Sequence, residues 1–252
     1  MYDPVRLAAK VEKLVTKNHL KKYYRFRGAP FYGSGVSTAD CVGCALRCVF
    51  CWSGFPRDSP EKAGKFYTPD QVAGQLIGIA EKRGFSKVRI SGNEPTIGKP
   101  HLIKLLNLMD KTSYRFILET SGILIDSDFS AHLSAFHNLH VRVSLKGTSN
   151  EEYARLTGAR PESFNLQLKA IDNLLEAGVS VHASVMVSFS SNENTEKLMK
   201  RLHEIDPNMF IEKEYVILYP LVIKRLINAE ITPIVAYDRS GNLCKLPSNP
   251  RL

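Results

Sequence analysis

The sequence predicts an α/β fold in which six strand–helix units form a partial (β/α)6 barrel after an N-terminal basic helical arm. Short β-like runs alternate with helical patterns along most of the chain, which indicates right-handed βαβ units and a parallel sheet. Six units in roughly 185 residues fall short of the eight units and ~250 residues of a closed barrel. With 252 residues, 44% hydrophobic and 23% charged, the composition is that of a folded globular protein.

The elements follow from local signals along the chain. Asp3-Pro4 predicts a first helix, because a capping side chain precedes a proline at the first helical position. Thr68, Pro69 and Gln71 give the same signals with a capping box. Strands are predicted at Val36–Asp40, Lys87–Ser91, Arg115–Thr120, His140–Lys146, Val179–Ser188 and Tyr215–Tyr219. Further helices are predicted at Leu102–Met109, Ser127–Phe136, Phe164–Glu176 and Thr195–Ile205.

These elements divide the chain into three parts. We expect a basic helix and arm over residues 1–35, the partial barrel over residues 36–236 and a tail over residues 237–252. The chain has 34 basic and 25 acidic side chains, a net charge of +9. Residues 1–27 hold eight of the basic and two of the acidic ones, so most of the excess charge belongs to the arm.

The basic run Leu20–Arg27 interleaves cations with aromatic residues, as proteins that bind single-stranded nucleic acid do. A solvated edge packed over the barrel is an equally good interpretation. If the run binds RNA, reversing Lys21 and Lys22 to glutamate should weaken RNA binding and leave the barrel chemistry intact.

Several patterns bear on the compartment. The longest apolar stretch, Val216 to Ile223, contains Pro220 and is far shorter than the ~20 residues of a membrane span. The N-terminus carries Asp3 and Arg6 without an apolar core, unlike a secretory signal. Four of the five cysteines lie within residues 41–51, which is typical of a metal site and not of a disulfide framework. We therefore expect a cytoplasmic protein with no membrane partner.

The cysteine cluster contains a C-x3-C-x2-C motif formed by Cys44, Cys48 and Cys51, with Phe50 before the last cysteine. Three thiolates can hold three irons of a [4Fe–4S] cubane and leave the fourth iron open. Structural zinc is the alternative, although zinc sites usually space their cysteine pairs a dozen or more residues apart. A non-enzymatic interpretation therefore stays open, in which the protein is an iron–sulfur electron carrier or a zinc-stabilised interaction module. The motif needs only three sulfurs, so Cys41 is expected not to be an obligatory ligand.

This loop, placed just after the first strand, resembles the signature of the radical S-adenosylmethionine (SAM) enzymes. The resemblance implies a six-unit partial barrel, a [4Fe–4S] cluster on the three cysteines and SAM bound to the open iron. It also implies oxidoreductase chemistry under anaerobic conditions. An external electron donor of the flavodoxin or ferredoxin type would reduce the cluster, and SAM would then be cleaved to methionine and a 5′-deoxyadenosyl radical.

Segments at later strand ends are similar to SAM-binding segments of that family. Gly92-Asn93-Glu94 resembles its Gly-Gly-Glu segment, which presents backbone groups and a carboxylate to the SAM amino group; Asn93 departs from the pattern. Glu119 and the three residues after it resemble the segment that touches the SAM ribose. The resemblance also implies cofactor contacts from the fourth strand. The full set of cofactor-binding residues that it implies is Phe50, Gly92, Asn93, Glu94, Glu119, Ser144 and Lys146.

The fourth strand end suggests one branch of the family. Ser144-Leu145-Lys146 and Leu156-Thr157-Gly158 are similar to segments of the glycyl-radical-enzyme activases, with Ser144 where the activases have aspartate. Lys146 would reach the SAM carboxylate. This resemblance implies a macromolecular substrate, a protein more than an RNA. The basic arm, and Trp52 after Cys51 as in some tRNA-modifying relatives, favour RNA as the alternative.

Overall fold

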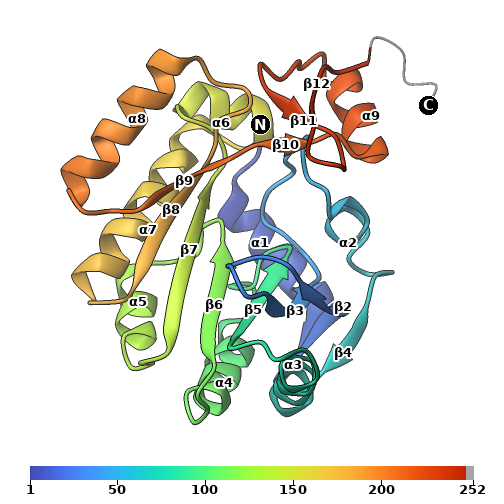
Figure 1. The fold of residues 1–252 in the computed structure, drawn as a ribbon, viewed down its shortest axis with the longest axis vertical. Coiled ribbons are helices and arrows are strands. Elements are labelled where there is room, and N and C mark those ends of the chain that lie inside the picture. The colour runs from blue at the N-terminus through green and yellow to red at the C-terminus, as the bar shows by residue number, and fades with distance from the viewer. Residues whose placement is uncertain (248–252) are drawn as a thin grey trace.

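In the computed structural model, which describes residues 1–247, a nine-stranded sheet forms the centre of the fold (Figure 1). Six of these strands are parallel neighbours in the order β3-β5-β6-β7-β8-β9. Their bounds are β3 Val36–Cys41, β5 Lys87–Gly92, β6 Arg115–Thr120, β7 Leu139–Leu145, β8 Val181–Met186 and β9 Ile211–Glu214. The parallel order confirms the predicted α/β class and the partial barrel.

An antiparallel extension lengthens the sheet beyond β3. Strand β2 (Leu20–Ala29) pairs with β3, and β1 (Thr16–Lys17) and β4 (Lys65–Tyr67) pair with β2. A register shift between Tyr23 and Arg25 bulges β2, and bulges of this kind bend a strand and increase its twist. The sequence analysis assigned no strand to this segment.

Helices cover one face of the sheet (Figure 1). Those packed around the barrel are α1 Pro4–Val15, α3 Pro69–Arg83, α4 Lys99–Met109, α5 Ser127–Leu133, α6 Asn150–Thr157, α7 Phe164–Glu176 and α8 Asn192–Ile205. A short α2 (Gly54–Asp58) and a 3-10 turn (Pro161–Ser163) complete this part. The predicted caps are confirmed, because Asp3 accepts hydrogen bonds at the start of α1 and Thr68 and Gln71 form a capping box at the start of α3.

The two faces of the parallel sheet differ in chemistry. The face toward the helices is apolar and belongs to the main core, with Val88, Ile90, Phe116, Leu118, Val141, Val143, Ala183 and Val185 buried. Because side chains alternate along a strand, the opposite, inner face takes the intervening residues. Most of these are polar or charged: Thr38, Asp40, Arg89, Ser91, Glu119, Arg142, Ser144, Ser184, Glu212 and Glu214.

Five of the six predicted parallel strands are confirmed to within two residues at each end, and the sixth is wrong. Strand β9 is Ile211–Glu214, whereas Tyr215–Tyr219 contributes Val216–Ile217 as β10 of a separate small sheet. The sequence Ile-Glu-Lys-Glu lacks an apolar run because Glu212 and Glu214 face the charged interior of the barrel. A search for hydrophobic strands therefore passed over it.

The C-terminal part packs as a small unit of its own. Strands β10, β11 (Ala236–Tyr237) and β12 (Leu243–Cys244) form a three-stranded sheet beside α9 (Pro220–Asn228), around a second apolar cluster (Figure 1). The predicted tail, residues 237–252, contributes β12 to this sheet; its residues 248–252 lie outside the described part. No helix within residues 1–247 is long and apolar enough to cross a membrane.

The basic run is not an exposed arm, as the RNA interpretation required. Lys21 is fully buried and donates from Nζ to the carbonyl oxygens of Glu94 (3.2 Å) and Ile97. Lys22 is also buried and donates to the carbonyl oxygens of Pro60 and Glu61 (3.0 and 2.9 Å). The two lysines therefore bind backbone on either side of β2 and are not available to phosphates.

We predict that Lys21→Glu lowers the free energy of unfolding by about 3–5 kcal/mol, because it buries a carboxylate against carbonyl oxygens. Urea unfolding followed by circular dichroism would measure this loss. Lys17→Glu, on the exposed side of β1, is the matched control and should unfold like the wild type. A Lys21→Glu protein of wild-type stability would contradict the buried placement.

Candidate active site

The cysteine loop, residues 42–53, leaves the carboxyl end of β3 and leads into α2. Backbone hydrogen bonds hold it at its start and in its middle. Val42 N donates to Lys22 O (3.0 Å), Glu94 N donates to Gly43 O (2.9 Å), and Val49 N donates to Leu156 O (2.9 Å). The loop is therefore tied to β2, to the turn after β5 and to the end of α6.

The three motif thiols lie at this edge of the sheet with little exposure. Cys48 is buried, and Cys44 and Cys51 are half-buried. Burial raises the pKa of Cys44, and it raises the pKa of Cys48 to about 11 although the nearby Lys146 ammonium partly offsets the effect. Within residues 1–247, no three His, Cys, Asp or Glu side chains converge as ligands of a single metal ion. A cubane makes a different demand, because each thiolate binds its own iron.

Cys41 lies apart from the other three. It is the last residue of β3 and follows Asp40, so its side chain points to the opposite face of the sheet. There it is fully buried in the main apolar core, where Tyr23 also packs. This placement favours a structural role for Cys41, as the sequence analysis expected.

Asn93, which replaces the second glycine of the resembling segment, binds the cysteine loop from both sides. Its Oδ1 accepts a hydrogen bond from Gly43 N (3.0 Å), and its Nδ2 donates to Ser53 O (3.1 Å). The amide therefore spans the loop from its first turn to its exit. Next to it, Gly92 has φ +93°, and a Cβ there would lie 3.0 Å from Asp40 Cα, so glycine is required.

The Glu94 carboxylate is 1% exposed and is surrounded by donors from the chain itself. It accepts from Thr96 N and Oγ1 (3.2 and 2.7 Å), from Thr120 Oγ1 (2.6 Å) and from Ser121 N and Oγ (2.9 and 2.5 Å). The carboxylate thus joins the turn after β5 to the turn after β6. The resemblance implied instead that the Glu94 carboxylate contacts the SAM amino group directly. That contact stays a prediction.

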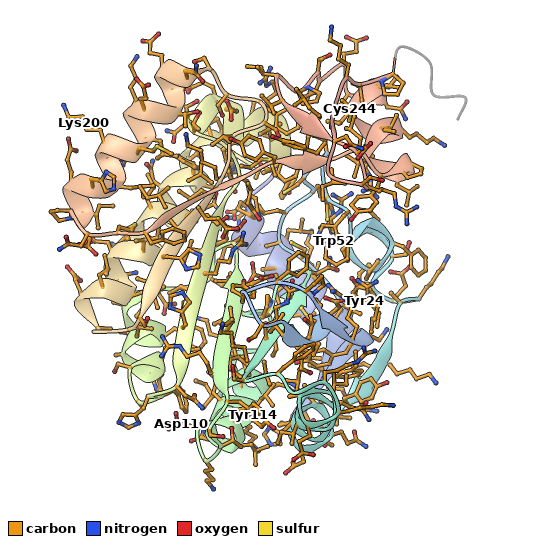
Figure 2. The ribbon with its side chains drawn as sticks, in the orientation of Figure 1. Tyr24, Trp52, Asp110, Tyr114, Lys200 and Cys244 are labelled. Atoms are coloured by element: carbon orange, nitrogen blue, oxygen red, sulfur yellow. The ribbon has the colours of Figure 1, made fainter. Side chains whose placement is uncertain are left out.

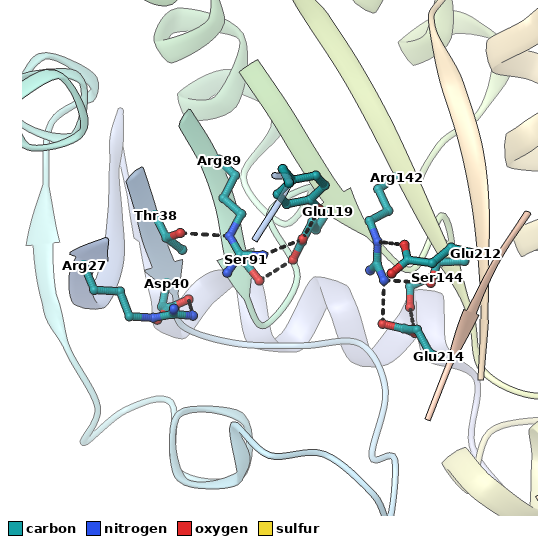
Figure 3. A network of polar contacts seen from close by, with 12 residues as sticks. Arg27, Thr38, Asp40, Arg89, Ser91, Glu119, Arg142, Ser144, Glu212 and Glu214 are labelled. Carbon is teal, nitrogen blue, oxygen red and sulfur yellow. Dashed lines mark hydrogen bonds and ion pairs between the residues drawn. The ribbon is translucent and has the colours of Figure 1, made fainter. Parts of the chain in front are cut away.

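Glu119 faces the barrel interior near the end of β6 (Figure 3). It accepts from Arg89 Nη1 (2.7 Å), from Ser91 Oγ (2.5 Å) and from the Tyr32 hydroxyl. Burial alone would raise the pKa of Glu119, but Arg89 and the other cationic and hydrogen-bonding neighbours outweigh it and lower the pKa. Tyr32 comes from the loop between β2 and β3, which therefore reaches into the barrel.

A second charged network links Lys146 to β9. Figure 3 shows its members Arg142, Ser144, Glu212 and Glu214. Lys146 Nζ donates to Ser144 Oγ (2.5 Å), and Ser144 Oγ donates to Glu214 Oε2 (2.7 Å). Arg142 binds Glu214 (Nη2 to Oε1, 2.7 Å) and Glu212 (Nε to Oε2, 2.7 Å). Where the activases have aspartate this chain has serine, and Glu214 supplies the nearby carboxylate instead.

The sequence analysis did not identify the polar and charged partners inside the barrel, which are Tyr32, Asp40, Arg89, Arg142, Glu212 and Glu214. A signal for most of them was present. Charged residues alternate at period two in the middle of predicted strands, as in Lys87-Val-Arg89 and His140-Val-Arg142. Such alternation indicates a strand with one polar face. Tyr32 lies in a loop, where no pattern predicts its direction.

Two other predicted features have structural partners. The Phe50 ring packs against Phe189, with centroids 5.7 Å apart, between the main and C-terminal cores. Leu156 and Thr157 end α6, Gly158 caps it in the left-handed conformation, and Leu156 O accepts the hydrogen bond from Val49. The stretch that resembles the activases therefore anchors the cysteine loop.

Comparison with protein families agrees with this arrangement. The model described as the radical SAM superfamily matches residues 40–202, which include the cysteine loop, the last two residues of β3 and the whole of β5, β6, β7 and β8. The chain therefore belongs to the radical SAM superfamily. Its cofactors are accordingly a [4Fe–4S] cluster and SAM.

Three curated relatives match between 54% and 69% of the chain. A probable GTP 3′,8-cyclase of Methanosarcina acetivorans is 29% identical over 171 residues, covering 66% of this chain and 49% of that protein. The tRNA 4-demethylwyosine synthase of Methanocaldococcus jannaschii is 24% identical over 204 residues, covering 69% and 63%. The mycofactocin maturase MftC of Mycobacterium ulcerans is 28% identical over 135 residues, covering 54% and 34%. The chain spans about half the length of the first of these relatives.

Solved structures share the fold. Streptococcus suis SuiB bound to S-adenosylmethionine superposes with a TM-score of 0.54 at 21% identity, covering 65% of this chain and 36% of that one. Native anSMEcpe with bound AdoMet gives a TM-score of 0.54 at 21% identity, covering 75% and 57%. Both likenesses concern the fold alone.

We predict that Asn93→Gly, which restores the usual family residue, weakens the site, because two hydrogen bonds to the cysteine loop are lost. The expected cost is about 2 kcal/mol in the free energy of unfolding, with less iron retained after anaerobic reconstitution. Iron analysis and thermal unfolding would measure both. The exposed Asn208→Ala is the control. Wild-type iron retention in Asn93→Gly would contradict the role given to the Asn93 amide.

The charged interior predicts a pH effect through Glu214. Burial would raise its pKa, but Arg142 and Lys146 outweigh burial and lower the pKa to about 2. A lowered folded-state pKa stabilises the fold above the unfolded pKa of ~4.3, and this stability is lost as the pH falls toward 2.

Glu214→Gln should therefore be less stable than the wild type by about 3 kcal/mol at pH 7, and the difference should shrink between about pH 5 and pH 2. Urea unfolding across this pH range measures it. Glu196→Gln, on the exposed face of α8, should follow the wild-type curve. A constant difference at every pH would show that Glu214 does not contribute as an ionised partner.

Proposed function

We propose that the chain is an enzyme that cleaves SAM reductively and uses the product to abstract hydrogen from a macromolecular substrate. The observation that supports this most is that the cysteine loop, the turn at Gly92–Glu94 and Lys146 meet at the carboxyl ends of β3, β5 and β7. Parallel α/β folds build their sites at this edge. Cys44, Cys48 and Cys51 would hold the cluster, which, with an external donor of the flavodoxin or ferredoxin type, would supply the electron for cleaving SAM to methionine and a 5′-deoxyadenosyl radical.

The proposed roles follow from the geometry of the chain's own residues. Cys44, Cys48 and Cys51 would hold three irons, on a loop that hydrogen bonds tie to β2, to the turn after β5 and to the end of α6. The segment Gly92–Glu94 contributes backbone groups, since the Asn93 and Glu94 side chains are directed to the chain itself. Lys146 is a point charge for the SAM carboxylate. Phe50, Glu119 and Ser144 complete the set that borders the cofactor.

For the substrate, we propose a protein, with a backbone glycine as the case that the activase-like stretch suggests. Protein is favoured over RNA because the cations expected to meet phosphates are engaged within the fold. Lys21 and Lys22 bind carbonyl oxygens, and Arg25 and Arg27 both pair with the buried Asp40 at 2.7 and 2.8 Å. Some relatives in this fold class were solved with peptides, as SuiB was with its precursor peptide SuiA.

RNA is the second candidate, and one surface feature supports it. Trp52 is 43% exposed directly after Cys51, with the Arg25 and Arg27 guanidinium carbons 5.4 and 5.9 Å from its ring centroid. Tyr24 lies on the same side of the molecule (Figure 2), and Arg25 is 5.6 Å from its ring centroid. An exposed aromatic ring beside cations is a platform on which a base can stack.

We predict that Cys48→Ala abolishes both the cluster and SAM cleavage, whereas Cys41→Ala keeps both, because only the first thiolate faces the site. The measurements are the iron content and the 5′-deoxyadenosine formed with dithionite under anaerobic conditions. A colourless wild-type protein that holds zinc and forms no 5′-deoxyadenosine would refute the proposed function. Loss of iron in Cys41→Ala would favour a four-thiolate electron carrier.

The substrate class can be separated with the same preparation. Peptides, tRNA and GTP would each be offered to the reconstituted enzyme with SAM and dithionite under anaerobic conditions, and each product analysed by mass spectrometry. A modified peptide supports the proposal. A modified tRNA whose formation requires Trp52, tested with Trp52→Ala, supports the second candidate, and a modified nucleotide alone would exclude both.

A further inference from the structure

Each cysteine of the motif has its backbone carbonyl oxygen bound by an arginine. Arg47 Nη1 donates to Cys44 O (2.8 Å), and Arg57 Nη1 donates to Cys48 O. Arg225 Nη1, from α9 of the C-terminal unit, donates to Cys51 O (2.8 Å). We call this set, Arg47, Arg57 and Arg225, the arginine cradle.

Asp58 joins two of the three arginines of the cradle. Asp58 binds Arg57 through two hydrogen bonds (Nε to Oδ1, 2.7 Å; Nη2 to Oδ2, 2.9 Å) and Arg225 through a third (Nη2 to Oδ2, 2.8 Å). Arg57 is only 4% exposed, and Arg47 and Arg225 are half-buried. Three guanidinium groups are therefore held against the cysteine loop with a single carboxylate among them, so the group stays positively charged.

Gly54 gives a second, independent sign that Arg225 belongs in this position. A Cβ at Gly54 would lie 1.8 Å from Arg225 Nη2. Gly54 begins α2 and has no left-handed backbone angle that would otherwise require glycine. The glycine therefore makes room for the guanidinium of a residue 171 positions later in the chain.

We propose that the arginine cradle raises the reduction potential of the cluster. This inference rests on the proposed function, since it takes Cys44, Cys48 and Cys51 as the ligands. Reduction adds one electron from an external donor and no proton, so the reduced cluster carries one more negative charge than the oxidised one. Fixed positive charges in a buried setting stabilise the more negative state. The three arginines bind the backbone of the cysteine loop, so they are positioning residues that act on the cluster through this loop.

The test is a potentiometric titration of the anaerobically reconstituted protein, followed by electron paramagnetic resonance. Arg225→Met should make reduction less favourable by about tenfold, which for one electron is a fall of about 59 mV. Asp58→Asn should shift the potential in the opposite direction, because it removes the only carboxylate of the group. Arg225→Lys, which keeps the charge, should stay near the wild-type potential.

Opposite signs for Arg225→Met and Asp58→Asn distinguish charge from structure, because a merely structural role would not reverse with the sign of the charge. Gly54→Ala should displace the guanidinium and shift the potential less than Arg225→Met does. Gly78→Ala, in α3 where a Cβ meets nothing within 4 Å, is its control and should leave the potential unchanged.

Two results would overturn the inference, and they are distinguishable. In the first, the wild type holds a [4Fe–4S] cluster, but the reduction equilibrium constants of Arg225→Met and Asp58→Asn both stay within twofold of the wild-type value. The role of the cradle is then wrong and the proposed function stands. If the wild type holds no such cluster, the proposed function fails, and this inference fails with it.

Discussion

The constraint on which the barrel depends is that charged side chains within a sheet need partners, because an unpaired buried charge costs several kcal/mol. On the inner face, Asp40 meets Arg25 and Arg27, Glu119 meets Arg89, and Arg142 meets the two glutamates of β9. The first two sets join neighbouring strands, β2 to β3 and β5 to β6, and the third joins β7 to β9 across β8. The inner face is therefore ordered by electrostatics, and the outer face by apolar packing against helices.

The candidate site depends on residues outside the cysteine motif. Asn93 spans the cysteine loop, the Glu94 carboxylate joins two strand-end turns, and buried Lys21 binds the backbone of the turn that carries Glu94. None of these contacts needs a metal. The loop is thus held by hydrogen bonds to three separate parts of the chain, which reduces the conformational entropy lost when a ligand binds it.

Apolar patterns in the sequence predicted the strands and helices that bury their side chains between the sheet and the helices. The spacing of the cysteines predicted the cysteine loop, because few other kinds of site use that spacing. The sequence analysis missed β9, because Glu212 and Glu214 stand where an apolar run was expected. It missed β2, because the charges of Lys21 and Lys22 suggest an exposed segment. Their partners are backbone carbonyls and charges far away in the chain. The sequence does not show which distant groups pair with one another, so the contacts of Glu94 and Asn93 were not foreseen.

The charge network also bears on where this protein can be divided. The region shared with the family ends at residue 202, before β9 and α9 begin. A fragment trimmed to that region would expose the edge of β8 and leave Arg142 without either carboxylate, and Cys51 O without Arg225. Residues beyond 202 therefore supply a sheet neighbour, two carboxylates and a guanidinium that the matched segment lacks.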